Sequence, residues 1–366
     1  MKAYVLHSIG DIRLEDVTKP QLNDGEVLVE VIAAGVCGSD IPRIYKTGAH
    51  THPLIPGHEF AGKVVQTGRQ ADGKWMDKRV GVFPLIPCGT CMPCRNKQYE
   101  MCRNYSYLGS RTDGGFAEYV AVPQDNLIEL PDNVSYEAGA MLEPMAVAVH
   151  AMRRAAFTQD DIVVVYGLGT IGLLLTMFLK EHGLKNILMI GNKEFQKQQI
   201  QNLGIDINDY CDSRNTDTRR WVLEKTGGQG ADVLFECVGR NETVTEVVNS
   251  AAPAGKIVMV GNPYSDMQLS KDIYWKILRN QITVMGTWNS SFTHSKDDDW
   301  NYVIDRLEQG SVTPEKLISH RFPLDELEKG FRIMRDKEED YVKIMGMCNE
   351  KEEIYEGKSK TDTPVS

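Results

Sequence analysis

The sequence predicts an α/β protein with two parts, one rich in β-strands and one with a parallel sheet wrapped by helices. Residues 1–150 consist mostly of short runs in which apolar and polar residues alternate between Gly, Pro and Asp, as in strands. From about residue 160, strand-like and helix-like runs alternate, as in parallel sheets with helices on their faces. The length of 366 residues suggests two domains, and a composition of 42% hydrophobic and 25% charged residues is ordinary for globular proteins.

The strands expected in the first part lie in four separate runs. These runs are VLVEVIAAGVC (27–37), GHEFAGKVV (57–65), DKRVGVF (77–83) and GGFAEYVAV (114–122). Glycine-rich turns separate them, so we expect a compact β structure over this part of the chain.

The second part begins with the short apolar run IVVVY (162–166), which predicts a buried strand. TIGLLLTMFLKEHG follows as a helix that ends at Gly183, and NILMIG (186–191) is the next strand. The remaining elements of this alternation are expected at KEFQKQQIQNLG (193–204), ADVLFECVG (231–239), TVTEVVNSAAPAG (243–255) and KIVMVG (256–261). Beyond residue 290 the pattern becomes mixed, with helices at 299–310 and 323–336, a strand at 340–348 and a polar tail over 349–366.

The overall charge excludes some classes of partner. There are 41 Lys and Arg against 51 Asp and Glu, so the formal net charge is 41 − 51 = −10. Nucleic acids and anionic membranes attract basic surfaces, so neither is expected to bind. No apolar run approaches the roughly 20 residues of a membrane span, and the N-terminal residues show no secretory signal. A cytoplasmic enzyme is the expectation.

Four of the eight cysteines lie together with the spacing C-x2-C-x2-C-x7-C. They are Cys88, Cys91, Cys94 and Cys102. Thiols in a reducing compartment do not form disulfides, and four thiolates make a closed, structural zinc site. An iron–sulfur cluster and unliganded thiols are the alternatives, although the last spacing is too long for a bacterial ferredoxin motif. The isolated Cys211, Cys237 and Cys348 are expected to be small buried residues.

A glycine motif, GLGTIG, lies between the strand at 162–166 and the helix that follows. Its residues Gly167, Gly169, Thr170, Ile171 and Gly172 match the G-x-G-x-x-G pattern of dinucleotide sites in the context that this pattern requires. The first glycine makes the turn, the second lets the backbone approach a pyrophosphate, and the third lets the helix pack on the strand. The sequence therefore predicts a Rossmann domain that binds NAD or NADP at the helix N-terminus.

The next strand ends without the acidic residue that usually binds the adenosine ribose of NAD. Gly191, Asn192 and Lys193 stand there instead. No carboxylate would repel a 2′-phosphate, and Lys193, or Lys197 one turn later, would attract one. NADP is therefore slightly favoured over NAD. In the alternative, Asn192 still binds the ribose and Lys193 is a solvated surface charge.

Sulfur, nitrogen and oxygen ligands for a second metal occur in three separate segments. Cys37 lies in AAGVCGSD, His58 and Glu59 lie in PGHEFAG, and Glu143 lies in MLEPMAVAVH. A catalytic zinc has three protein ligands and one exchangeable position. Each of these residues alone would be weak evidence, but together with the four cysteines they predict two Zn²⁺ per chain.

With these motifs in place, the chain up to about residue 347 resembles the zinc-dependent medium-chain alcohol/polyol dehydrogenases. The resemblance rests on GVCGSD, PGHEFAG, the four-cysteine run, DGGFAEY, LEPMAVAVH and GLGTIG. Finer features are similar to the galactitol-1-phosphate 5-dehydrogenase branch, namely CGSDIPRIYKTGAH, PLIPC, YLGSRTDGGFAEY and KILRNQITVMGTWNSS.

The resemblance implies a GroES-like catalytic domain over 1–150 and 289–348, with a structural zinc lobe at about 85–105. A Rossmann domain over 151–288 would be inserted between its two halves. It also implies a homodimer or homotetramer.

Residue roles follow from the same resemblance. Cys37, His58 and Glu143 match the catalytic zinc ligands, and Glu59 matches a residue that binds the metal in only some relatives. Ser39 matches the hydroxyl that carries the substrate proton outward. Many relatives have a His three residues later, but Pro42 stands there in this chain, so the proton would leave through the nicotinamide ribose, His50 or water.

The implied reaction is the oxidation of a secondary alcohol of a polyol phosphate, such as galactitol 1-phosphate, to the ketose. Candidate substrate residues are Arg43, Lys46 and Arg111 for the phosphate, and Trp288 and Asn289 for the polyol. Sorbitol, threonine or another free alcohol is the alternative substrate. A non-catalytic zinc-binding module and a catalytically silent scaffold are the remaining alternatives.

Overall fold

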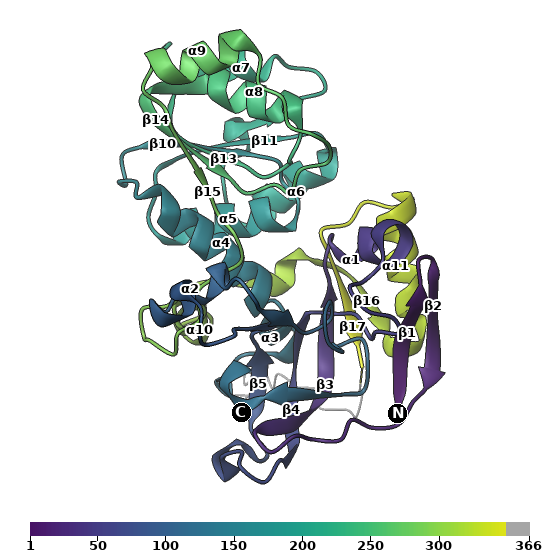
Figure 1. The fold of residues 1–366 in the computed structure, drawn as a ribbon. Helices are drawn as coiled ribbons and strands as arrows, with labels where there is room; N and C mark the ends of the chain where they lie inside the picture. The colour runs from purple at the N-terminus through teal and green to yellow at the C-terminus, as the bar shows by residue number, and fades with distance from the viewer. Residues whose placement is uncertain (349–366) are drawn as a thin grey trace, which may run out of the picture.

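The computed structural model describes residues 1–348, and the polar tail predicted over 349–366 lies outside the described residues. Two large sheets dominate the described part, one above the other in Figure 1. The lower sheet has seven strands in the order β16-β17-β3-β4-β5-β9, and β8 also pairs with β3. The upper sheet has six strands in the order β12-β11-β10-β13-β14-β15. The predicted α/β class, with a β-rich part and a doubly wound parallel sheet, is confirmed.

The lower sheet combines the N-terminal half of the chain with its C-terminal end. Its strands are β3 (Glu26–Val36), β4 (Glu59–Thr67), β5 (Arg79–Val82), β8 (Tyr119–Pro123), β9 (Leu127–Glu129), β16 (Ile318–Pro323) and β17 (Lys343–Met347). β17 pairs antiparallel with β3 and parallel with β16. The chain thus leaves this sheet and returns to it after the upper sheet is complete.

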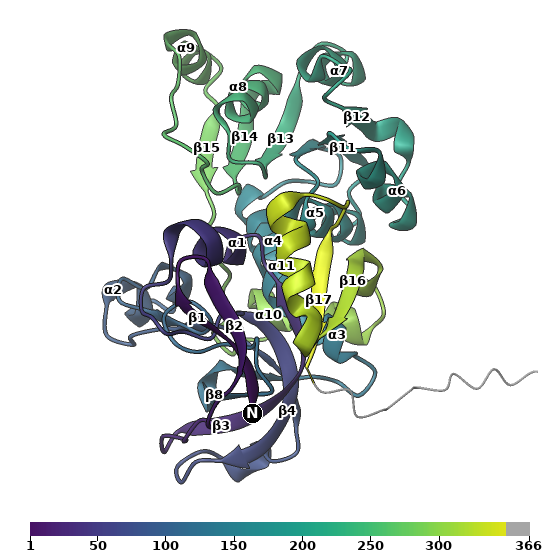
Figure 2. The ribbon, with the colours of Figure 1, turned by 90° about the vertical axis from the view of Figure 1, so that its right-hand side faces the viewer.

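Smaller elements surround the lower sheet. They are the hairpin β1 (Lys2–Ser8) and β2 (Asp11–Asp16), the pair β6 (Leu85–Ile86) and β7 (Ser106–Tyr107), and the helices α1 (Asp40–Pro42), α2 (Met92–Arg95), α3 (Tyr136–Ala140) and α11 (Leu327–Asp336). In Figure 2, α11 and β17 lie beside one another, and their upper ends reach toward α5 of the upper part. A hydrophobic core that includes Phe60, Phe116 and Phe331 joins the sheet to α11.

Every neighbouring pair of strands in the upper sheet is parallel. The strands are β10 (Ile162–Tyr166), β11 (Asn186–Gly191), β12 (Tyr210–Asp212), β13 (Ala231–Glu236), β14 (Ala251–Met259) and β15 (Thr283–Gly286). The helices are α5 (Thr170–Glu181), α6 (Glu194–Asn202), α7 (Thr218–Lys225), α8 (Asn241–Ser250) and α9 (Lys271–Arg279). Counted along the chain, the strand order is 3-2-1-4-5-6, the order of dinucleotide-binding folds, which bind at the point where this order reverses.

Two further helices connect the sheets. Helix α4 (Leu142–Ala155) packs against α5 and α10 (Asp299–Glu308), and one hydrophobic core includes Leu142 of α4, Phe178 of α5 and Trp300 of α10. The domain boundary expected at residue 150 falls inside α4, because one continuous apolar face of this helix serves both parts. Among the described residues, no helix has the length and apolar character needed to cross a membrane.

Candidate active site

Three potential metal ligands meet where β3 ends and β4 begins. Gly35 of β3 pairs with Glu59 of β4, so this antiparallel register brings Cys37, just beyond β3, next to His58 and Glu59. One ligand atom from each of these three residues lies within 4.8 Å of the others. A thiolate, an imidazole and a carboxylate at this spacing fit the three-ligand pattern of a catalytic zinc site.

The buried Asp40 supports two of these groups, although the sequence analysis did not select it. Its Oδ2 accepts the backbone N–H of Cys37 at 3.0 Å, and its Oδ1 lies 3.3 Å from Nδ1 of His58. Burial alone would lower the pKa of His58, but the charges of Asp40 and Cys37 outweigh it and raise this pKa well above its usual value. A carboxylate on the outer side of a ligating histidine orients the ring toward the metal. The only feature of the sequence that pointed to Asp40 was its place in GVCGSD.

Glu59 has a buried cationic partner from the far end of the chain. Lys343, at the start of β17, donates to Oε2 of Glu59 and also to the carbonyl of Val36 at 3.2 Å. Both side chains are buried, and their opposite charges compensate one another where water cannot. A Cβ atom on Gly35 would lie 2.6 Å from Oε2 of Glu59 and 2.7 Å from Cε of Lys343, so only glycine leaves room for this pair.

Glu143 lies near these residues but outside the cluster of three. Oε1 of Glu143, in the first turn of α4, accepts a hydrogen bond of 3.1 Å from the hydroxyl of Tyr107, whose ring packs edge-on against His58. Burial and the nearby charge of Glu59 raise the pKa of Glu143 to about 7, although the charge of His58 opposes them. The geometry thus groups Glu59, rather than Glu143, with Cys37 and His58. Tyr107 is a further residue that the sequence analysis missed.

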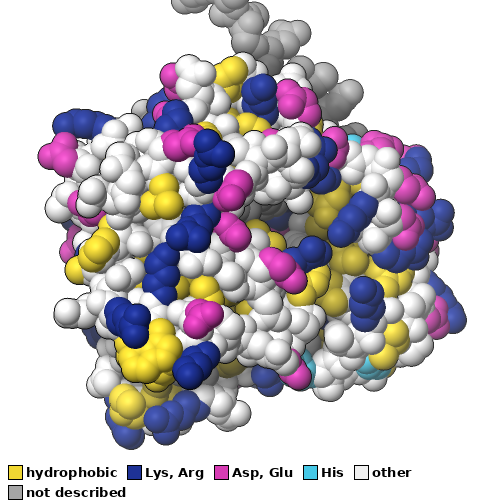
Figure 3. All heavy atoms as spheres, turned by 90° about the horizontal axis from the view of Figure 1, so that it is seen from above, with side chains coloured by type: hydrophobic (Ala, Val, Ile, Leu, Met, Phe, Trp, Pro, Cys, Tyr) yellow, Lys and Arg dark blue, Asp and Glu magenta, His cyan; other side chains and the backbone are white. Residues whose placement is uncertain are grey.

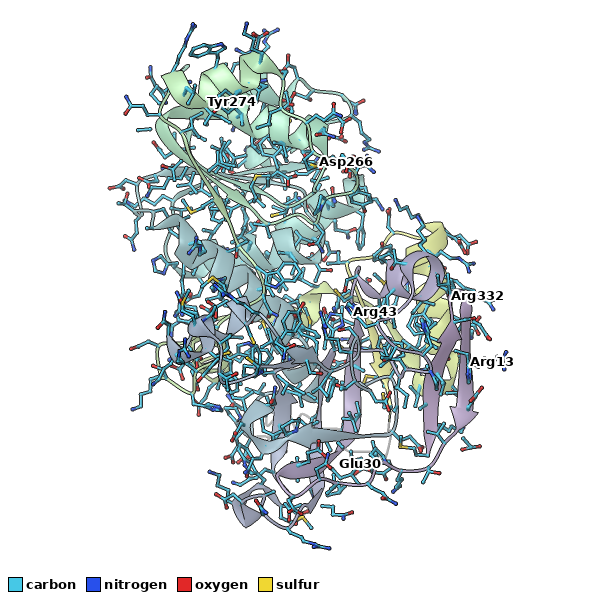
Figure 4. The ribbon with its side chains drawn as sticks, in the orientation of Figure 1. Arg13, Glu30, Arg43, Asp266, Tyr274 and Arg332 are labelled. Carbon is cyan, nitrogen blue, oxygen red and sulfur yellow. The ribbon has the colours of Figure 1, made fainter. Side chains whose placement is uncertain are left out.

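Of the predicted relay and phosphate residues, Ser39 contacts Cys37 of this cluster and Arg43 contacts Asp40 beside it. The Ser39 hydroxyl donates to the Cys37 sulfur at 3.3 Å, and Pro42 ends α1. Arg43 donates to the buried Asp40, so its guanidinium already has a carboxylate partner. Figure 4 shows Arg43 in the lower part, near its boundary with the upper part. Lys46 is exposed, in the short π-helix Arg43–Thr47.

The other three substrate candidates are farther along the chain. The Arg111 guanidinium lies 4.6 Å from the centre of the Tyr105 ring, in the loop after β7. Trp288 is 57% exposed just beyond β15, and Asn289 has a positive φ of 56° and accepts the backbone N–H of Ser290. These contacts do not bring Trp288 or Asn289 together with the cations.

The four-cysteine segment folds into one sulfur cluster. The sulfur atoms of Cys91 and Cys94 are 3.4 Å apart, those of Cys88 and Cys94 are 4.0 Å apart, and those of Cys91 and Cys102 are 3.9 Å apart. Tetrahedral ligands with Zn–S bonds of about 2.3 Å would be separated by about 3.8 Å. The donor set and its spacing therefore fit zinc.

The thiols of this cluster differ in acidity. Backbone N–H groups of Thr90 and Cys91 lower the pKa of Cys88 to about 6, whereas burial and the neighbouring sulfur of Cys91 raise the pKa of Cys94 to about 12. Without a cation, Cys94 would remain protonated at neutral pH. Binding of a metal must therefore displace protons from this lobe.

The glycine motif forms the turn between β10 and α5. Gly167 has a φ of 93°, and Gly169 precedes the first residue of α5, Thr170. A Cβ atom on Gly172 would lie 1.9 Å from the carbonyl oxygen of Gly167, whereas a Cβ atom on Gly169 would meet nothing within 4 Å. Gly172 is thus required for packing of helix on strand, and Gly169 leaves an open approach to the helix N-terminus.

Substitution by Ala is expected to have different consequences at these two glycines. Gly172→Ala is expected to lower the free energy of unfolding by about 2 kcal/mol or more, because a backbone carbonyl must move. Gly169→Ala is expected to leave stability nearly unchanged but to weaken NAD(P)H binding by about tenfold, because a methyl group enters the phosphate approach. Denaturant unfolding and cofactor fluorescence titration measure the two effects. Equal stability of the two variants would contradict the packing role of Gly172.

The end of β11 carries polar groups around Gly191. Oε1 of Gln196 accepts the backbone N–H groups of Asn192 and Lys193 at 2.8 and 3.1 Å, and the Tyr210 hydroxyl donates to the carbonyl of Lys193 at 2.9 Å. A Cβ atom on Gly191 would lie 2.4 Å from Oε1 of Gln196 and 2.9 Å from the Tyr210 ring. A larger residue, such as the usual acid, would therefore clash here. Lys197 pairs with Glu194 at 3.7 Å on the first turns of α6.

Comparisons with known proteins agree with this architecture. The family model of the alcohol dehydrogenase GroES-like domain matches residues 23–132, and that of the zinc-binding dehydrogenase matches residues 170–309. Galactitol 1-phosphate 5-dehydrogenase of Escherichia coli is 32% identical over 322 residues, which cover 88% of this chain and 92% of the relative. A sorbitol dehydrogenase of Halalkalibacterium halodurans is 30% identical over 342 residues, which cover 92% and 97%.

Solved structures that resemble this chain also include dehydrogenases. The crystal structure of galactitol-1-phosphate dehydrogenase from Escherichia coli has a TM-score of 0.88 and 30% identity, covering 95% of this chain and all of that one. A Sinorhizobium meliloti protein solved with bound NADP has a TM-score of 0.86 and 27% identity, covering 95% and 99%. The GroES-like and Rossmann parts, the metal-ligand clusters and these relatives together lead to one conclusion: the chain belongs to the zinc-binding, medium-chain alcohol/polyol dehydrogenases and is an oxidoreductase.

Proposed function

We propose that this enzyme oxidises a secondary alcohol of a polyol phosphate, such as galactitol 1-phosphate, to the ketose, with hydride transfer to NAD(P). The observation that carries this proposal is the meeting of Cys37, His58 and Glu59 beside a dinucleotide-binding sheet. We propose one zinc at these three residues and a second zinc at the four-cysteine lobe.

Each residue of the site has a role in this proposal. When bound, zinc supplies a Lewis acid that lowers the pKa of the substrate hydroxyl, and the nicotinamide accepts the hydride. Cys37, His58 and Glu59 hold the metal, and Asp40 orients His58 through its carboxylate. The Ser39 hydroxyl, 3.3 Å from the Cys37 sulfur, receives the substrate proton. Because Pro42 cannot relay a proton, the nicotinamide ribose, water or the exposed His50 would carry it outward.

Glu143 has a different task in the same site. Its carboxylate accepts a hydrogen bond of 3.1 Å from the Tyr107 hydroxyl, and burial raises its pKa above the usual value. We propose that Glu143 faces the reacting hydroxyl as a hydrogen-bonding group rather than as a permanent metal ligand. Glu59, with its charge compensated by Lys343, is the carboxylate ligand.

The cofactor preference we propose is NADP over NAD. Gly191 ends β11 without a carboxylate, and Gln196 and Tyr210 fill the space that a longer side chain would need. Lys193 supplies a positive charge beside this position. The bound NADP of the Sinorhizobium meliloti protein supports this choice, and the NADH bound to another relative from Escherichia coli keeps NAD as the alternative.

The substrate is tested by initial rates with polyol phosphates, the matching free polyols and threonine, each with NAD and with NADP. We expect a polyol phosphate to exceed its free polyol by about 100-fold in kcat/KM, equivalent to about 2.7 kcal/mol of transition-state binding. Arg43, Lys46 and Arg111 then become the residues to replace. Equal rates with the free polyol would overturn the phosphate assignment and favour a sorbitol-type dehydrogenase, whose relatives match almost as well.

The homodimer or homotetramer and the cytoplasmic location stay predictions. Support for a homo-oligomer comes from exposed apolar side chains on α9, on the edge strand β15 and in the adjoining loops, namely Tyr264, Met267, Leu269, Tyr274, Trp275, Leu278, Val284 and Trp288. Figure 3 shows apolar side chains on the upper face of the molecule, and Figure 4 places Tyr274 at the upper end, away from Arg43. A monomeric mass in solution would contradict the oligomer.

A further inference from the structure

A single short segment at the start of β17 contacts three separate places in the proposed site. Asp340 pairs with Lys193, Val342 accepts a hydrogen bond of 2.6 Å from the Thr170 hydroxyl, and Lys343 pairs with Glu59. The segment belongs to the lower part of the molecule, whereas Lys193 and Thr170 belong to the upper part. Figures 1 and 2 both show the segment that leads into β17 reaching up to the region of α5 and α6.

The contact nearest to the adenosine end is the ion pair of Asp340 and Lys193. Nζ of Lys193 lies 2.8 Å from Oδ1 of Asp340 and 6.0 Å from the centre of the Tyr341 ring. The two charged side chains are 40% and 52% exposed, so a ligand from solvent can reach them. Lys193 also stands two residues after Gly191, the last residue of β11, beside the place where a 2′-phosphate would lie.

We propose that Asp340 is a specificity-determining residue that competes with the 2′-phosphate of NADP for Lys193. This inference rests on the proposed role of Lys193 in binding that phosphate. When the phosphate takes the ammonium group, the Asp340 carboxylate loses its partner and stands close to a second anion. NAD has no 2′-phosphate and leaves the ion pair intact. Asp340 therefore weakens NADP binding relative to NAD binding. It reduces the difference between the affinities of the enzyme for the two cofactors.

The surrounding contacts allow the ion pair to open without displacing the segment. Val342 stays bound to Thr170, and Lys343 stays bound to Glu59 and to the carbonyl of Val36. These contacts do not involve the Asp340 carboxylate. Replacing Asp340 with the isosteric Asn therefore removes the charge and leaves the anchors of the segment in place.

The experiment measures the dissociation constants of NADPH and NADH by fluorescence with the full-length enzyme, in the absence of substrate. Asp340→Asn is expected to tighten NADPH binding by about threefold, on the scale of one exposed ion pair, with little change for NADH. The matched control is Glu339→Gln, which removes the same charge one residue earlier, where the carboxylate faces His320 at 3.1 Å. This control is expected to leave both constants unchanged.

Lys193→Ala separates the inference from the function on which it rests. It is expected to weaken NADPH binding but not NADH binding. Asp340→Asn should tighten NADPH binding less in this background than in the wild type, because no ion pair has to open. If Lys193→Ala behaves in this way but Asp340→Asn does not tighten NADPH, competition is overturned and the NADP site stands. If Lys193→Ala changes the dissociation constants of NADPH and NADH equally, Lys193 does not bind the 2′-phosphate, and the inference fails as well. If Glu339→Gln tightened NADPH binding as much as Asp340→Asn does, the specific role of Asp340 would also be overturned.

Discussion

Replacing Cys37 with Ser is expected to reduce kcat/KM by at least about a thousandfold, because changes around metal ligands alone cost 10- to 100-fold. A serine hydroxyl stays protonated near neutral pH and is a poor zinc ligand, so His58 and Glu59 would be left as a two-ligand site. Metal analysis should show the loss of one zinc per chain. The far-ultraviolet circular dichroism should be unchanged, because Cys37 lies just beyond the end of β3 and forms no strand pair.

Cys211→Ala is the matched control for this loss of a thiol. Cys211 is a buried residue of β12 in the upper sheet and belongs to neither sulfur-containing ligand cluster. Its replacement should retain full metal content and activity at moderate temperature. If Cys37→Ser retained near wild-type turnover and both metals, the catalytic zinc assignment would be wrong.

Replacing Cys94 with Ser is expected to remove the other zinc and to lower the thermal unfolding midpoint by roughly 5 °C, equivalent to about 2 kcal/mol or more in a chain of this size. Cys94 is one of the two buried cysteines of the lobe and lies within 4.0 Å of two other sulfur atoms. A serine there would leave three thiols around an incomplete site. Protease cleavage within residues 88–102 should accelerate, since little regular structure holds this segment.

Thr90→Ala provides the control within the same lobe. The Thr90 hydroxyl donates to the Cys88 sulfur at 3.7 Å, but it is not one of the four clustered ligand groups. This variant should keep its zinc and its unfolding midpoint. Unchanged metal content and stability in Cys94→Ser would refute the four-cysteine site.

Comparison of the two metal clusters shows why one was easier to predict than the other. The four cysteines lie within one short segment, so their spacing alone predicted a common site. The second set comes from separate segments, and the sequence offered both Glu59 and Glu143 as the carboxylate. The register of β3 against β4 groups Glu59 with Cys37 and His58, while Tyr107 binds Glu143.

The sequence by itself determined the α/β class, the alternation of strands and helices in the upper sheet, the glycine turn and the cysteine lobe. Each of these depends on the periodicity or spacing of residues that are close together in the chain. Only the tertiary structure decided that Lys343 neutralises Glu59 and that Asp340 meets Lys193, residues that are 284 and 147 positions apart. The physical reason is that such contacts depend on strand register and on the docking of the two parts, which no local pattern specifies.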